Sequence, residues 1–70
     1  MDKKYVLKNL REGYFQGIDY DHFEPYFSSD IIHARLFDSE QEAEGNLLEM
    51  RQEYKRVEGV YVILPVIAIY

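Results

Sequence analysis

The densest group of side chains that could do chemistry lies between residues 19 and 30. Its ionisable members are Asp19, Asp21, His22, Glu24 and Asp30. Carboxylate oxygens are the ligands that hard cations such as Ca²⁺ prefer, and Asp19 and Asp21 match the first and third ligand positions of an EF-hand loop. Phe23, however, stands where a third oxygen ligand belongs, and Glu24 stands where the loop needs glycine. We therefore expect no EF-hand, and a looser divalent-metal site remains an alternative.

Side chains suited to nucleophilic or acid–base catalysis are sparse. The chain has no cysteine, and its serines lie in no nucleophile-elbow context. His22 and His33 have the chemistry of general bases, but a chain of 70 residues offers no obvious deep pocket. The four glycines match neither phosphate-binding spacing. We expect no enzyme, no catalytic residue and no cofactor.

Four aromatic rings are interleaved with the acids of the same stretch: Tyr20, Phe23, Tyr26 and Phe27. Rings placed among polar groups are common in recognition surfaces, because they supply contact area with little side-chain entropy to lose. Small domains also use such rings to fill the core. Two alternatives follow: either Phe23 and Phe27 pack inward, or at least two of the four rings face a partner.

The charges divide the chain into three parts. Residues 1–11 carry four basic side chains against one acid, whereas residues 12–49 carry ten acids against Arg35 alone. The remainder has a net charge of +1, and the whole chain has a net charge of −5. This field disfavours direct nucleic-acid binding, which depends on Lys and Arg that neutralise phosphates. It favours either a partner with a basic surface or mere solubility.

Residues 39–58 have the pattern of one amphipathic helix. Five apolar residues recur at spacings of three or four: Ala43, Leu47, Met50, Tyr54 and Val57. Ser39 is an expected N-cap, and Glu42 could complete a capping box. Lys55 and Arg56 would lie in the last turn, with Gly59 just past the helix end.

The remaining elements are expected to be strands and one loop. Residues 3–18 read as a hairpin that turns at Gly13, residues 19–30 as an acidic aromatic loop, and residues 31–37 as a third strand. Residues 60–69 form an apolar run that is shorter than the ~20 residues a membrane-spanning helix needs, so we expect a strand. Pro65 implies a bulge, an edge position or a division of that strand.

Both faces of this final strand are apolar. One face would carry Tyr61, Ile63, Ile67 and Ile69, and the other Val60, Val62, Leu64 and Val66. A single helix covers only one face of a small sheet, so the other face needs the folded-back loop or a second subunit. We expect self-association as a homodimer through Tyr61, Ile63, Ile67 and Ile69.

These elements predict a single small α+β domain over residues 1–70, ordered β-β-β-α-β, with one helix packed on one face of the sheet. A chain of this length buries only ~60% of the surface that it exposes when unfolded. No secretory signal is evident at its start. We expect a cytoplasmic protein without a membrane segment.

Two segments resemble the small accessory proteins encoded by bacteriophages of Gram-positive bacteria. The first is Tyr5-Val6-Leu7-Lys8-Asn9 with Gly13-Tyr14-Phe15, and the second is Ala34-Arg35-Leu36-Phe37-Asp38-Ser39 with Glu42-Ala43. Many characterised proteins of that kind bind and block a host protein, including defence nucleases of the CRISPR type. The matched positions form scaffold, so the resemblance carries over no functional residue.

The resulting hypothesis is an inhibitor or modulator that binds a bacterial host protein stoichiometrically in the host cytoplasm. Its expected contact residues are Asp19, Tyr20, Asp21, Glu24, Tyr26, Phe27, Asp30, Glu40 and Glu44. A self-assembling structural or regulatory module is the alternative, and a small divalent-metal-binding protein is the third.

Overall fold

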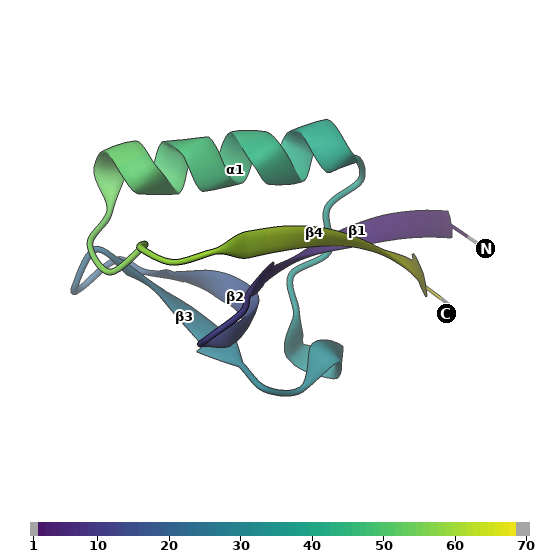
Figure 1. Ribbon diagram of the computed structural model, residues 1–70, viewed down its shortest axis with the longest axis horizontal. Helices are drawn as coiled ribbons and strands as arrows, with labels where there is room; N and C mark the ends of the chain where they lie inside the picture. Colours follow the sequence, from purple (N-terminus) through teal and green to yellow (C-terminus); the bar gives the residue numbers. More distant parts are fainter. Residues whose placement is uncertain (1, 69–70) are drawn as a thin grey trace.

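The fold is a four-stranded antiparallel sheet with one α-helix on one side (Figure 1). The computed structural model describes residues 2–68. The elements follow in the order β1 (Asp2–Asn9), β2 (Gly13–Asp19), β3 (Glu24–Ser28), the 3₁₀ helix η1 (Ile31–His33), α1 (Glu40–Glu53) and β4 (Tyr61–Ala68). The sheet order is β3-β2-β1-β4. The predicted α+β class and the strand-strand-strand-helix-strand order are confirmed.

The third strand lies earlier in the chain than the sequence pattern predicts. Residues 24–28 form β3 inside the stretch expected to be a loop, and β3 pairs with β2 from Tyr14–Ser28 to Asp19–Glu24. Pro25 lies within this strand. It is tolerated because β3 is an edge strand, where a missing N–H on the open side costs the sheet no hydrogen bond.

Residues 31–37, predicted as a strand, instead form η1 and then a crossing segment between β1 and β2. The Phe37 and Tyr5 backbones exchange both of their hydrogen bonds, at 2.8 and 2.9 Å, and the Arg35 N–H donates to the Phe15 carbonyl at 2.9 Å. β1 and β2 pair directly only at Lys8–Tyr14 and Asn9–Gly13. The crossing segment takes the place of the missing pairs, and it leads the chain from η1 on one side of the sheet to α1 on the other (Figure 1).

Helix α1 begins where predicted and ends five residues early. The Ser39 hydroxyl accepts the Glu42 N–H at 3.0 Å, which confirms the N-cap, while the Glu42 carboxylate accepts the Asp38 N–H and not that of Ser39. At the other end Tyr54 is extended, and the Lys55 N–H donates to the Phe23 carbonyl at 2.8 Å. This tertiary bond replaces the one that helix continuation would make. Lys55, Arg56 and Gly59 therefore lie in a connecting segment.

The hydrophobic core fills the space between α1 and the sheet. Its buried members are Leu7, Phe15, Phe37, Ala43, Met50 and Val57. The Phe15 and Phe37 rings stack with centroids 6.3 Å apart. Leu47 and Tyr54 pack against this core. The predicted apolar side of the helical segment is thus confirmed, although Val57 reaches the core from beyond the helix.

Asn9 is a buried polar side chain that joins two turns. Its Oδ1 accepts the N–H groups of Arg11 and Glu12 at 2.9 Å each, which closes the β1–β2 turn. Its Nδ2 donates to the Glu58 carbonyl at 3.3 Å. These bonds satisfy the amide, as burial requires, and they hold the segment that enters β4 against the end of β1.

β4 is continuous through Pro65, which pairs with Tyr5. Pro65 does not divide the strand because β4 lies at the edge of the sheet. Pro65 therefore occupies an edge position, which is one of the three possibilities that the sequence left open beside a bulge and a divided strand.

Two glycines make a matched test of the fold. Gly13 has φ +107°, and a Cβ there would lie 2.4 Å from the Ser28 carbonyl oxygen, whereas a Cβ on Gly45 would meet nothing within 4 Å. We expect Gly13→Ala to lower the free energy of unfolding by at least about 1 kcal/mol and Gly45→Ala, in mid-helix, to raise it by about 1 kcal/mol. Urea denaturation followed by circular dichroism measures both. Equal effects of the two substitutions would contradict the assigned turn and helix.

Candidate binding surface

The β2–β3 turn, residues 20–23, is held in one conformation by side-chain and backbone hydrogen bonds. Asp19 Oδ1 accepts the Asp21 N–H at 3.0 Å, and Asp19 Oδ2 lies 2.7 Å from His22 Nδ1. The Asp19 carbonyl accepts the His22 N–H at 3.3 Å. One aspartate therefore fixes the three residues that follow it, as Asp commonly does in turns.

Two large rings project from this fixed turn into solvent. Tyr20 is 68% exposed and Phe23 is 56% exposed. Phe23 also has a φ of +54°, a left-handed conformation that costs a residue with a side chain about 1 to 2 kcal/mol. The Tyr20 ring meets the Tyr54 ring edge-on, with centroids 6.4 Å apart. The turn is thus anchored on one side by the end of α1, and its rings stay accessible.

The segment after α1 brings basic groups to the acidic turn. Lys55 is bonded to Phe23 through its backbone, and Arg56 Nε lies 3.8 Å from Glu24 Oε2. Arg56 also has a positive φ, +57°. We call the exposed region formed by these two segments the turn surface. Its residues are Asp19, Tyr20, Asp21, His22, Phe23, Glu24, Tyr54, Lys55 and Arg56.

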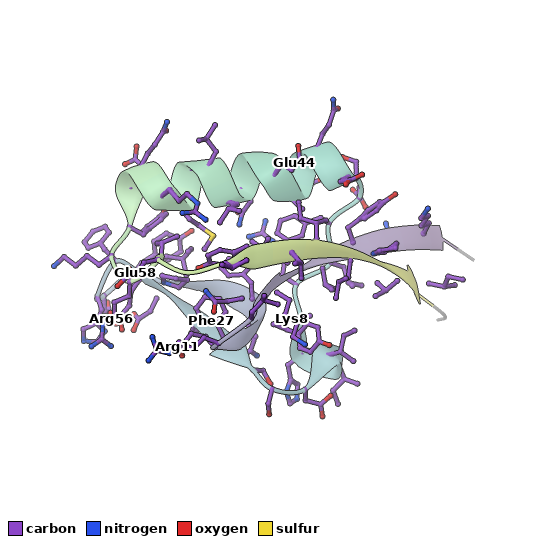
Figure 2. All side chains as sticks on the ribbon, viewed as in Figure 1. Lys8, Arg11, Phe27, Glu44, Arg56 and Glu58 are labelled. Atoms are coloured by element: carbon purple, nitrogen blue, oxygen red, sulfur yellow. The ribbon has the colours of Figure 1, made fainter. Side chains whose placement is uncertain are left out.

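A hollow of about 350 Å³ adjoins the turn surface and shares Glu24 and Arg56 with it. Its lining residues are Arg11, Glu12, Glu24, Pro25, Phe27, Arg56 and Glu58. Figure 2 shows Arg11, Arg56 and Glu58 gathered at one end of the molecule, with Glu44 far from them on α1. Pro25 and Phe27 contribute apolar lining and the other residues contribute charges of both signs, so the hollow suits no single type of small ion.

The Asp19–His22 contact shifts the titration of both groups. The hydrogen bond from His22 lowers the pKa of the Asp19 carboxyl, and the same bond raises the pKa of the His22 imidazole above its ordinary value of 6.5. The contribution of His22 to the turn is therefore present below pH 6.5 and is lost as the pH rises through its pKa in the folded protein. The contribution of Asp19 is present above its ordinary value of 3.8 and is lost as the pH falls through its lowered pKa.

The structure brings together four of the nine residues expected to contact a partner: Asp19, Tyr20, Asp21 and Glu24. It places the other five elsewhere. Phe27 packs against the core, as the inward alternative predicts, whereas Phe23 is exposed, against that alternative. Tyr26 alternates with Phe27 along β3 and lies across Gly17 on the opposite face of the sheet.

The remaining three expected contact residues lie far from the turn surface. Asp30 caps η1 by accepting the Ile32 N–H. Glu40 and Glu44 are exposed in the first half of α1, at the opposite end of the helix from Tyr54. The nine expected contact residues therefore lie on several separate elements and do not form one surface.

The expected self-association residues do not form one exposed surface. Tyr61 and Ile63 are partly buried and pack against the core on the α1 side of β4. Ile67 is 64% exposed, and Ile69 lies outside the described residues. The face of β4 turned away from α1 carries Val62, Leu64 and Val66, which are half-buried. The alternation along the strand is correct, but the sequence could not show which face the helix covers.

Within residues 2–68 the structure has neither a metal-binding cluster nor a membrane-spanning helix. No three carboxylate or imidazole groups of this part are grouped to hold a metal ion. Asp19 is occupied by its bonds to Asp21 and His22, and Asp30 by its cap. No helix in this range has the length and apolar character needed to cross a bilayer.

Comparison with protein-family models, with curated proteins and with solved structures finds no match to this chain.

Sequence reasoning missed the contribution of Tyr54, Lys55 and Arg56 to this surface. It assigned Tyr54 to the apolar face of the helix and Lys55 and Arg56 to its last turn, whereas the three follow α1 and contact Tyr20, Phe23 and Glu24, respectively. A signal was present in part, since two adjacent basic residues after a helical pattern also suit a surface loop. The hydrogen bond that ends the helix has no sequence signature.

An NMR titration of His22 tests the geometry of the turn. We expect Asp19→Asn to lower the pKa of His22 towards 6.5, because the anionic acceptor that favours the imidazolium is lost. Asp21→Asn is the matched control: it also removes one negative charge from the turn but leaves the 2.7 Å contact in place. A His22 titration that is the same in Asp19→Asn and in the wild type would rule out the contact in solution.

Proposed function

We propose that this protein acts by binding another protein stoichiometrically through the turn surface. The observation that carries the proposal is Phe23, whose side chain is exposed and whose backbone has the left-handed conformation. Glycine or asparagine would adopt this conformation at lower cost. Burial does not explain the phenylalanine either, since the residue is 56% exposed. Strain at an exposed aromatic residue supports a role in recognition.

The architecture of the turn suits this role. Exposed aromatic rings are frequent anchors of protein interfaces, and rings that are already fixed lose little conformational entropy on binding. The Tyr20 ring contacts the Tyr54 ring, and the backbone of Phe23 is held by the bond from Lys55. The adjoining hollow, with its mixed charges, offers polar contacts at the rim of such an interface.

The proposed partner is a bacterial host protein with a basic surface. The net charge of −5 favours encounter with a basic protein over direct contact with nucleic acid. The resemblance to phage accessory proteins makes a nucleic-acid-handling defence protein, including the CRISPR type, the first class to test, in the host cytoplasm. Asp19, Asp21 and Glu24 supply the acidic groups, although Lys55 and Arg56 partly offset them.

A self-assembling module is the second candidate, because one face of β4 is apolar and lies away from α1. Val62, Leu64 and Val66 would form the contact, in place of the residues that the sequence suggested. Light scattering across a concentration series tests it, and a constant monomer mass at high concentration would remove this candidate.

The substitution Phe23→Asn separates recognition from folding. Asparagine removes the ring and tolerates φ +54° better than phenylalanine does, so we expect thermal stability to stay equal or to rise. We expect the affinity for the partner to fall about tenfold or more, as for truncation of an interface anchor. The partner is first captured with tagged wild-type protein from nuclease-treated bacterial lysate, and its affinity is then measured by calorimetry with purified components.

Leu48→Ser is the control for loss of an exposed apolar side chain, since Leu48 is 59% exposed on α1, outside the turn surface. We expect it to bind as the wild type does. Equal binding by Phe23→Asn and the wild type, with both proteins folded, would refute the proposed role of the turn surface.

A further inference from the structure

The hydrogen-bonding direction of each residue in β4 follows from its partner in β1. The Tyr5 N–H and C=O both bond to Phe37, on the side of β1 away from β4. In an antiparallel pair, two residues opposite each other either bond to one another or both direct their N–H and C=O groups away from the partner strand. Pro65, opposite Tyr5, therefore directs its nitrogen and carbonyl towards the open edge of the sheet. Because this direction alternates along a strand, the backbone N–H and C=O groups of Tyr61, Ile63 and Ile67 also point to the open edge. Those of Val62, Leu64 and Val66 bond to β1.

The other edge of the sheet has the same arrangement. The Phe15 carbonyl accepts a bond from Arg35, on the side of β2 away from β3, so Phe27, opposite Phe15, points outward. The register irregularity lies in β2 between Phe15 and Gly17, and β3 continues without interruption. Pro25, two residues before Phe27, therefore also points outward. The chain has two prolines, and each removes a donor from one open edge.

We propose that Pro65 keeps the outer edge of β4 closed to pairing with the same strand of a second copy of this chain. β4 is eight residues long and carries donors at Tyr61, Ile63 and Ile67 on its open side. Such an edge is a template for strand addition, and proteins commonly close it with proline. This inference is independent of the turn surface.

The position of Pro65 decides how much of a ladder can form. A two-fold antiparallel pairing centred on Leu64 would place Ile63 of one copy opposite Pro65 of the other, and Tyr61 opposite Ile67. Both bonds at Tyr61 and Ile67 could form, but the Ile63 carbonyl would find no donor on Pro65. The Ile63 carbonyl of each copy would then lose its hydrogen bond to water without gaining a donor in the ladder. This cost opposes association.

Amide hydrogen exchange measured by NMR tests the inference in two steps. In the wild type we expect slow exchange at Val62, Leu64 and Val66 and fast exchange at Tyr61, Ile63 and Ile67. In Pro65→Val we expect the fast group to become protected as concentration rises. The mass from light scattering should double relative to the wild type, because the missing donor is restored and the affinity between copies tightens by roughly tenfold or more.

The double variant Pro65→Val/Ile67→Pro moves the missing donor to another outward position and is the matched control. Ile67 is largely exposed and its N–H makes no bond to β1, so the fold should tolerate proline there. We expect this variant to return to the mass of the wild type. Uniform exchange along β4 in the wild type would overturn the assigned directions. A folded Pro65→Val with unchanged mass and exchange would overturn the closure by Pro65.

Discussion

The reciprocal hydrogen bonds between Tyr5 and Phe37 are the constraint on which the rest of the structure depends. They fix the crossing segment between β1 and β2, and so determine the side of the sheet on which α1 packs. Phe37 enters the core at this point and stacks on Phe15, while its neighbour Asp38 forms an ion pair with Lys4. Without this crossing, the helix would have no path from η1 to the core side of the sheet.

A second set of backbone bonds ties the functional surface to this scaffold. The bond from Lys55 to Phe23 ends α1 and braces the β2–β3 turn at once. The connecting segment then buries Val57 and reaches Asn9, whose amide holds the Glu58 carbonyl at the entry to β4. A chain with so small a core spreads its stabilising contacts over such connections. The exposed rings of the turn are therefore attached to a rigid part of the molecule.

The sequence predicted the elements whose signals are local and missed those that depend on distant contacts. The turn at Gly13 and the cap at Ser39 follow from residue type and spacing, and both are present. β3 was missed because Pro25 reads as a break unless the strand is known to lie at an edge. The helix end was misplaced because a carbonyl some thirty residues earlier in the chain, that of Phe23, competes for the Lys55 N–H.

The candidate site was predicted in the same uneven way. Asp19, Tyr20, Asp21 and Glu24 are close in sequence, so a single turn keeps them together. Glu40 and Glu44 share only their charge with that group, and charge does not specify position. For β4, two apolar faces give no sign of which one the helix will cover.

The pairing of β1 with β4 has a consequence for the order of folding. β1 makes eight residue pairs with β4, from Asp2–Ala68 to Asn9–Tyr61, and only two with β2. β1 thus finds most of its partners in β4, although β2, β3 and α1 lie between the two strands in the sequence. During translation β1 has to wait, with Val6 and Leu7 unburied, until β4 has left the ribosome. Closing so long a loop slows folding relative to a sheet made of successive hairpins, and a nascent chain leaves most of β1 without its partner until β4 has followed.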